Sequence, residues 1–234
     1  MSHLEIANAA VEAYGCLPKR LKVPEDAWSV FSSLVCTKPG ERYPKALAIG
    51  IGNRCVGNDQ ADKGGLDIVA DCHAEALVGR ACRVLFLRSL RKLCCHQHEI
   101  FLATLAECSF HLVVSDSPCG DSSIRGIVSS DTSQATHATN WSGAPLLPIS
   151  LLDERCGSGN NKISMHYDSR DSQVIGCCRL KPGRSDLPPD KRSHSLSCSD
   201  KIVLWSSLGF QGGGVLASLM GKLPLHSVII MADH

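Results

Sequence analysis

The sequence lacks a strong excess of charge of either sign. Lysine and arginine total 24 and aspartate and glutamate total 23, which leaves a net charge of +1. Overall charge therefore gives no sign of nucleic-acid binding, and affinity for phosphate groups would need a local basic patch. The sequence also lacks an apolar run near the roughly 18 residues that a membrane span needs. Residues 1–12 contain no apolar signal core. We therefore expect no membrane partner.

Cysteine, in contrast, is abundant, with 13 in 234 residues. Their number is odd, their spacing is irregular, and the chain is too long for a small disulfide scaffold. These features predict a reducing compartment, the nucleus or the cytoplasm. Most of the thiols are then expected to be small buried side chains, while a few could bind metal.

The pattern of apolar residues predicts an α/β fold in one domain over residues 1–234. Helical spacing predicts three helices, over residues 4–14, 71–95 and 198–219. Short apolar runs predict strands at residues 46–52, 110–115, 173–180 and 225–231. We expect Asp71 to cap the second helix and residues 55–57 to pair with the first strand as a hairpin. Residues 122–172, rich in small polar side chains, are expected to form an irregular insertion.

A histidine and a glutamate stand two residues apart near the start of the predicted helix over 71–95. In His73-Ala74-Glu75 the imidazole can bind a metal ion while the carboxylate remains a base. Zinc lowers the pKa of a bound water towards neutrality, and the glutamate can carry the proton of that water. A lone His-x-Glu pair is common by chance and usually lies on a helix surface, so a metal site needs further ligands.

Pro118-Cys119 follows the predicted strand over 110–115 and offers a second ligand. Zinc nucleobase deaminases combine His-x-Glu with Pro-Cys-x-x-Cys. Here Ser122 stands where the second cysteine of that motif would be. The difference argues against an ordinary cytidine deaminase and against the bacterial type of tRNA deaminase. A third ligand would have to come from elsewhere, and the other cysteines are candidates.

Three motifs together resemble the signatures of the eukaryotic RNA adenosine deaminases, and they occur in that family's order. They are Asp71-Cys72-His73-Ala74-Glu75, Ser117-Pro118-Cys119-Gly120-Asp121, and Ser197-Cys198-Ser199-Asp200-Lys201-Ile202 followed by Trp205 and Gln211. The resemblance spans roughly residues 15–230. It implies a cytidine-deaminase-like three-layer α/β/α fold with a central mixed sheet. We expect that fold to be incomplete at its C-terminal end, because the family's domain continues well beyond the position of His234.

By this resemblance His73, Cys119 and Cys198 bind zinc, with water as the fourth ligand. Glu75 is then the catalytic residue, which deprotonates the attacking water and then protonates the adenine ring nitrogen and the leaving ammonia. Adenosine becomes inosine. The alternative for each cysteine is an inert buried thiol. A purely structural zinc site is also possible, but it would need no base and would close its fourth position with a protein ligand.

The family also buries an inositol hexakisphosphate. The positions that match residues around this ligand are Asp71, Arg80, Lys201, Trp205 and Gln211. The sequence departs from the family pattern nearby, with Gly79 and Leu204 in place of arginines and Ala70 in place of an asparagine. Such a highly charged ligand needs several cations to offset its desolvation, so we expect it to be held weakly. The alternatives are a solvated helix face for the two basic residues and core packing for the tryptophan.

RNA is the partner that the resemblance implies. Asn53 and Arg54 match a family position near the target nucleotide, while Lys181 and Arg184 could contact phosphates from the basic loop before Cys198. The stretch 180–184 resembles the branch that acts on tRNA, which converts adenosine 37 of alanine tRNA to inosine. The alternatives are a solvated basic loop and a truncated, inactive homologue that binds RNA or zinc without turnover.

Overall fold

The computed structural model describes residues 1–24, 26–57, 60, 63, 68–93, 95–123, 146–147, 178–181, 193 and 195–231. The chain divides into two compact units. The first unit comprises Met1–Arg54, Cys72–Ser117 and Ile202–His234, and the second comprises Cys55–Asp71 and Pro118–Lys201. Most of the predicted insertion over 122–172 lies outside the described residues, as does Arg184.

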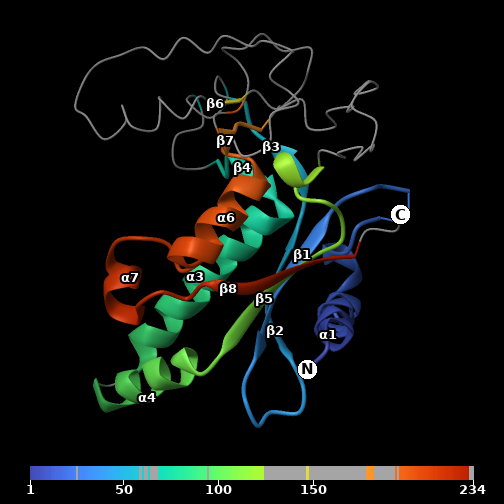
Figure 1. The fold of residues 1–234 in the computed structure, drawn as a ribbon. Helices are drawn as coiled ribbons and strands as arrows, with labels where there is room; N and C mark the ends of the chain where they lie inside the picture. Colours follow the sequence, from blue (N-terminus) through green and yellow to red (C-terminus); the bar gives the residue numbers. More distant parts are fainter. Residues whose placement is uncertain are drawn as a thin grey trace, which may run out of the picture. The chain divides into compact units, whose positions relative to one another are not determined.

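A four-stranded mixed sheet forms the centre of the first unit (Figure 1), with the strand order β2-β1-β5-β8. Its strands are β1 (Phe31–Thr37), β2 (Lys45–Ile51), β5 (Ser109–Val114) and β8 (Leu225–Ile230). Strand β1 runs antiparallel to both β2 and β5, and β5 runs parallel to β8. The predicted strands over 46–52, 110–115 and 225–231 are confirmed, and so is the α/β class with a mixed sheet.

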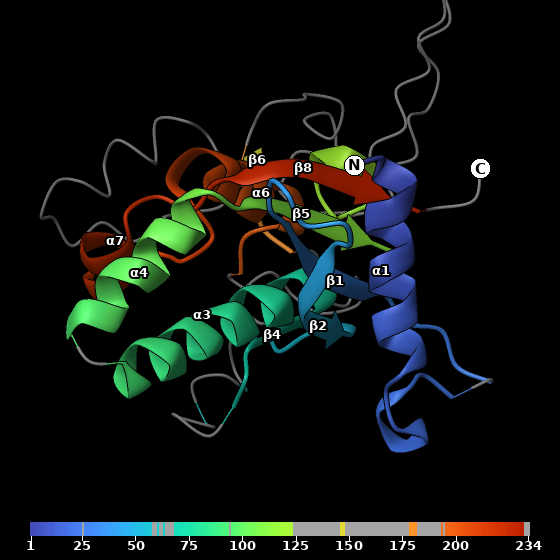
Figure 2. The ribbon, with the colours of Figure 1, turned by 90° about the horizontal axis from the view of Figure 1, so that it is seen from below.

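Successive side chains of each strand point to opposite faces of the sheet. Apolar side chains on both faces therefore form two cores, one on each side of the sheet. Leu34 and Leu112 face the core under helix α3 (Ala74–Lys92), whereas Val35 and Val113 face helix α1 (His3–Gly15). Figure 2 shows α1 on one side of the strands and α3 on the other. Within the first unit, helices therefore cover both faces of the sheet. Its specific likeness to the cytidine-deaminase fold stays a prediction.

The local sequence explains where α1 begins. The hydroxyl of Ser2 accepts a hydrogen bond from the backbone N–H of Glu5, and the Glu5 carboxylate accepts one from the backbone N–H of Ser2. This reciprocal capping satisfies N–H groups that the first turn of a helix leaves unpaired. The predicted helix over 4–14 is confirmed.

Two predictions around the second helix were wrong. Asp71 does not cap it, because Asp71–His73 forms strand β4 and the N-cap of α3 is His73. Residues 55–57 do not extend a hairpin with β2. Instead β3 (Asn53–Cys55) pairs with β4, and the N–H of Val56 donates to the carbonyl of Ala70 at 2.8 Å. Backbone pairing over this distance in sequence overrides the local helical pattern.

The predicted helix over 198–219 is two helices, α6 (Cys198–Leu208) and α7 (Val215–Met220). Gly209 and Gly214 lie between them with positive φ angles of 93° and 63°, a conformation that ends a right-handed helix. The remaining described elements are η1 (Lys19–Leu21), α4 (Cys95–Ala106), η3 (Asp121–Ser123), β6 (Leu146–Leu147) and β7 (Cys178–Arg179). None of the helices in the described part of the chain is long and apolar enough to cross a membrane.

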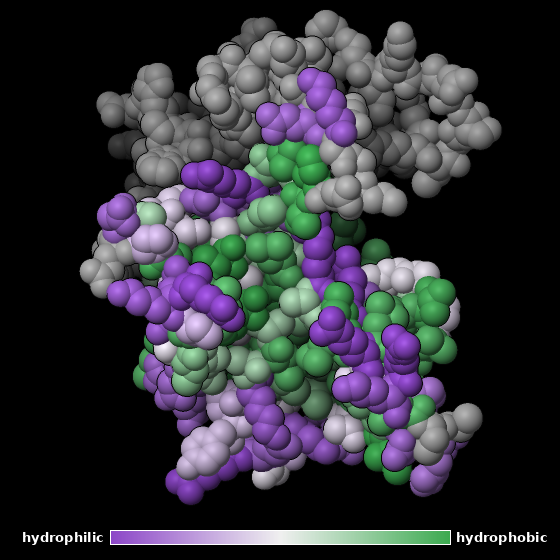
Figure 3. Space-filling model, turned by 180° about the vertical axis from the view of Figure 1, so that it is seen from behind, coloured by the Kyte–Doolittle hydropathy of each residue, from purple (hydrophilic) through white to green (hydrophobic). Residues whose placement is uncertain are grey.

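Large apolar side chains also reach the surface of the first unit. Figure 3 shows apolar surface gathered in the middle of one face. Apart from the surface in this view, exposed apolar residues also occur on α6 and α7, namely Val203, Leu204, Leu208, Val215 and Leu219. These two helices therefore carry apolar side chains on their exposed sides as well as towards the core.

Helix α3 begins in direct contact with the end of β2. The N–H of Ala74 donates to the carbonyl of Gly52 at 2.8 Å. A Cβ atom at Gly50 would lie 2.2 Å from the carbonyl oxygen of Ala74. Only glycine at this position allows the backbone of the helix to approach the strand so closely.

Replacing Gly50 with alanine should lower the free energy of unfolding by about 1–3 kcal/mol, because the added methyl overpacks against backbone. Urea denaturation measures the change. The matched control is Gly213→Ala, since a Cβ there would meet no atom within 4 Å. Equal midpoints for the two variants would contradict the close contact between β2 and α3.

A buried histidine links three strands of the sheet. The Nε2 atom of His111 on β5 lies 3.0 Å from Thr37 Oγ1 on β1, and Nδ1 lies 2.8 Å from Ser227 Oγ on β8. Burial lowers the pKa of His111, and the positive charges of His226 and His3 lower it further. The folded chain therefore favours the neutral form of this imidazole.

Because the pKa of His111 is lower in the folded chain, the unfolded chain binds its proton more readily at mildly acidic pH. This stabilising contribution is complete above the unfolded pKa of about 6.5. It is lost as the pH falls from there through the folded pKa. Urea titrations from pH 7.5 to about 5 should show a shallower loss of stability for His111→Gln than for the wild type. The variant of exposed His96, His96→Gln, should follow the wild type.

Candidate metal centre

Cys198 is the first residue of helix α6 in the second unit. The helix starts there because the hydroxyl of Ser197 accepts a hydrogen bond from the N–H of Asp200 at 3.2 Å, the geometry of an N-cap. The side chain of Cys198 is completely buried. A thiolate at this position is favoured, since the N-terminal end of a helix carries a partial positive charge.

The loop that carries Cys119 packs on this first turn. The N–H of Cys198 donates to the Cys119 sulfur at 3.3 Å, and the N–H of Ser199 donates to the Cys119 carbonyl at 3.0 Å. Gly120 has a φ of 105°, and a Cβ there would lie 2.3 Å from the Ser197 hydroxyl. Glycine at position 120 therefore lets the two cysteines come together.

A buried lysine lies beside Cys198. Lys181 Nζ donates to the Cys198 sulfur at 3.2 Å and forms an ion pair with Asp71 at 2.8 Å. The Lys181 side chain is 0% exposed and that of Asp71 is 3% exposed. Lys201, which is partly exposed, pairs with the second carboxylate oxygen of Asp71. Within the second unit, two cysteines, two lysines and one aspartate therefore form a single, largely buried polar cluster.

The charges in this cluster fix the protonation of its members. Burial alone would raise the pKa of Asp71, but Lys181 and Lys201 outweigh it and lower that pKa to about 2. Burial alone would lower the pKa of Lys181, but the negative charges of Cys198, Cys119 and Asp71 outweigh it and raise that pKa. The ammonium group next to the sulfurs favours their thiolate form, which is the form that binds metal.

His73 and Glu75 lie at the start of α3 in the first unit. His73 is the N-cap, with the extended backbone typical of that position, and Glu75 lies in the first turn. The Glu75 side chain is almost fully buried, at 3% exposure of the residue. The positive end of the helix stabilises a carboxylate there.

His73, Cys119 and Cys198 each offer one ligand atom, and these atoms lie within 4.8 Å of one another. The group could hold a metal ion. One imidazole and two thiolates are a donor set that suits zinc, and three protein ligands leave one position open for water. Lys181 donates a hydrogen bond to the Cys198 sulfur, and the N–H of Cys198 donates one to the Cys119 sulfur. Such hydrogen bonds commonly orient the ligands of a metal ion.

The structure corrects the prediction that Lys181 contacts RNA, because a fully buried ammonium paired with Asp71 cannot reach a phosphate in solvent. Sequence reasoning missed its place beside Cys198. The one available signal was that Lys181 directly follows an apolar strand. Asn53 is half-buried and Arg54 is exposed on β3, so Arg54 is accessible to a ligand.

Three of the residues predicted around inositol hexakisphosphate have other contacts. Trp205 packs against α3 at Gly79, where a Cβ would lie 3.0 Å from its ring. The amide of Gln211 donates to the carbonyl of Leu208 and accepts from the N–H of Leu223. Lys201 pairs with Asp71 as described above. Trp205 and Gln211 therefore stabilise the fold. Arg80 is exposed on α3.

Arg83 is a further cation that sequence reasoning did not single out for this ligand. Its Nε donates to the carbonyl of Phe210 at 3.4 Å. Burial lowers the pKa of Arg83, and the charge of Arg80 one helical turn away lowers it further. Two adjacent guanidinium groups on α3 are a feature that favours anions.

The chain belongs to the adenosine-deaminase (editase) domain family, whose model matches residues 48–234. It is similar to tRNA-specific adenosine deaminase 1 of Drosophila melanogaster, with 28% identity over 211 residues that cover 89% of this chain and 50% of the relative. It is also similar to the double-stranded RNA-specific adenosine deaminase of Mus musculus, with 26% identity over 97% of this chain and 19% of the relative. For the human tRNA-specific adenosine deaminase 1, the identity is 24% over 97% of this chain and 65% of the relative. The chain thus spans half or less of the first two relatives.

Replacing Lys181 with methionine should lower the free energy of unfolding of the metal-free chain by about 3–5 kcal/mol, because Asp71 loses a buried partner. The control is Lys38→Met, which removes a surface ion pair with Glu107 and should change stability by about 0–1 kcal/mol. Urea denaturation with a chelator present measures both. Equal loss in the two variants would show that the buried cluster adds nothing beyond a surface pair.

Proposed function

We propose that this chain carries a zinc-dependent adenosine deaminase site that converts adenosine to inosine in RNA by hydrolysis. The observation that carries the proposal is the group of His73, Cys119 and Cys198 in a chain of the editase family. The names of the similar proteins, which act on tRNA or on double-stranded RNA, support RNA as the substrate class.

We propose that His73, Cys119 and Cys198 are the zinc ligands. Zinc bound by them would lower the pKa of a water in the open fourth position. The ammonium group of Lys181 favours the thiolate form of the nearby sulfurs and donates a hydrogen bond to Cys198, which orients that side chain. The cap at Ser197 fixes the first turn of α6 and with it the position of the Cys198 sulfur.

We propose that Glu75 is the catalytic residue. Its carboxylate takes one proton of the water whose oxygen adds at C6 of adenine, and delivers that proton to N1. It then carries the second proton, from the new C6 hydroxyl, to the amino group, which departs as ammonia. The sum is adenosine plus water giving inosine plus ammonia. Burial at the first turn of α3 supports this role, because it holds the carboxylate in one orientation away from bulk solvent.

Within RNA, we propose tRNA as the substrate, at adenosine 37 of alanine tRNA. The similarity to two tRNA-specific deaminases supports this choice. Asn53 and Arg54 are the proposed contacts near the target nucleotide, and Arg184, outside the described residues, is the proposed phosphate contact. Double-stranded RNA is the alternative substrate, and inosine formation in it is compared with that in tRNA.

We propose that inositol hexakisphosphate contacts Arg80 and Arg83, and that this chain holds it weakly. Gln211 and Trp205 are engaged within the fold, and Lys201 is paired with Asp71. Among the described residues around this site, few positive charges therefore remain to balance the negative charge of the six phosphate groups. The phosphorus content of the purified chain reports on this point directly.

Elemental analysis of the purified chain should give one zinc per chain, and incubation with alanine tRNA should produce inosine. Glu75→Gln should keep the zinc and slow deamination by about 10²–10⁴-fold, because only the proton carrier is lost. Cys198→Ser should lose both zinc and activity. The surface variant Glu12→Gln serves as the matched control for Glu75 and should behave as the wild type.

Zinc without inosine from any RNA would overturn the enzymatic proposal. Inosine from double-stranded RNA but not from tRNA would overturn the proposed substrate alone. Absence of zinc from a folded wild-type chain would overturn the ligand set.

A further inference from the structure

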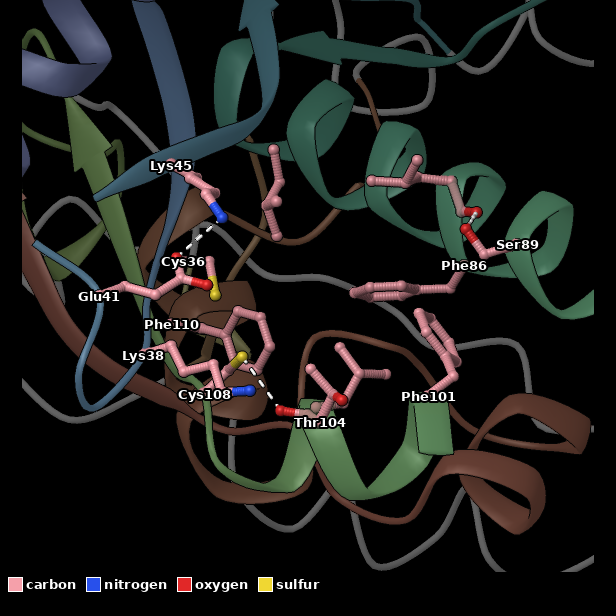
Figure 4. Close-up of a pocket in the computed structure, with 13 residues that line it drawn as sticks. Cys36, Lys38, Glu41, Lys45, Phe86, Ser89, Phe101, Thr104, Cys108 and Phe110 are labelled. Carbon is pink, nitrogen blue, oxygen red and sulfur yellow. Dashed lines mark hydrogen bonds and ion pairs between the residues drawn. The ribbon is translucent and has the colours of Figure 1, made fainter. Parts of the chain in front are cut away.

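A cavity of about 230 Å³ lies in the first unit (Figure 4), and none of the proposed zinc ligands lines it. It is partly open to solvent, and it is bordered by the ends of β1 and β2, by the start of β5 and by helices α3 and α4. Its apolar lining consists of Leu47, Leu85, Phe86, Phe101, Leu105 and Phe110. The cavity is thus walled largely by aromatic rings and leucines, as pockets for small molecules usually are.

The charged groups that line this cavity are already paired. Lys45 forms an ion pair with Glu41 at 2.8 Å, and Lys38 forms one with Glu107 at 3.1 Å. A charged ligand would have to compete with these pairs while losing its own hydration. The lining therefore favours an uncharged ligand.

Three neutral polar groups of the lining already donate their hydrogens to backbone carbonyls. The hydroxyl of Ser89 donates to the carbonyl of Leu85 at 2.9 Å, and that of Thr104 donates to the carbonyl of Ile100 at 2.8 Å. The Cys108 thiol donates to the Thr104 carbonyl at 3.2 Å. Each of these groups can still accept a hydrogen bond but has no hydrogen left to donate.

The thiols of Cys36 and Cys108 also line the cavity. Burial and the neighbouring Cys108 raise the pKa of Cys36 to about 12. The Cys36 thiol therefore stays neutral at physiological pH and acts as a soft, apolar surface that packs well on aromatic rings.

We propose that this cavity binds an uncharged aromatic compound of one or two fused rings that carries a hydrogen-bond donor and no strong acceptor. An apolar cavity of about 150 Å³ holds one benzene ring, so the larger volume here accommodates a larger ring system. Indole has this chemistry. Adenine has a similar size, but its ring nitrogens could accept hydrogens only from Lys38 and Lys45 among the lining residues, and these ammonium groups are already paired with Glu107 and Glu41. Burying the ring nitrogens without well-placed donors disfavours binding.

Indole binding to the full chain can be measured by equilibrium dialysis, with adenine as the polar comparator. We expect saturable binding of one indole per chain and a Kd for adenine at least about tenfold higher. Leu85→Trp fills the cavity from α3 and should raise the Kd for indole by about tenfold or more. Ser89→Trp, one turn further along α3, provides a second filling variant.

The matched control is Leu87→Trp, which changes an exposed leucine on the same helix that does not line the cavity. It should bind indole as the wild type does. Circular dichroism of each variant separates loss of folding from loss of binding. Failure of the wild type to bind indole, equal binding of adenine, or an equal loss in Leu87→Trp would each overturn the proposal.

Discussion

The buried ion pair between Lys181 and Asp71 is the interaction on which the cysteine cluster depends. A lysine without exposure to solvent must have partners, and here they are the Asp71 carboxylate and the Cys198 sulfur. Asp71 ends the first segment of the second unit, while Lys181 and Cys198 both lie in its other segment, far along the chain. One ammonium group therefore joins two distant parts of the sequence, at Asp71 and at Lys181–Cys198, and favours the thiolate form that binds metal.

Helix starts determine how the site residues point. His73 is the N-cap of α3, Glu75 lies in the same first turn, and Cys198 is the first residue of α6. Backbone N–H groups at helix starts point along the axis and favour negative charge. The fold thus uses the same physical device twice, once for a carboxylate and once for a thiolate.

Much of this arrangement could be predicted from the sequence, because the motifs around His73, Cys119 and Cys198 are local and specific. The break between α6 and α7 was also visible in principle, since Gly209 and three glycines from Gly212 stand inside the helical pattern. The burial of Lys181 could not be predicted. It depends on partners far from it in sequence, whereas a lysine beside a proline has the local signature of an exposed loop. The strand at Asp71 was missed for the same reason.

Gln211 closes the turn between α6 and α7 with one side chain. Its amide holds the carbonyl of Leu208 on one side and the N–H of Leu223 on the other. Between Leu208 and Leu223 lie Gly213 and Gly214, and a Cβ atom added at either glycine would meet no other atom within 4 Å. Because the ends are fixed and loop entropy grows slowly with length, this turn is a permissive place for inserted sequence, suited to carrying a tag or a fluorescent reporter.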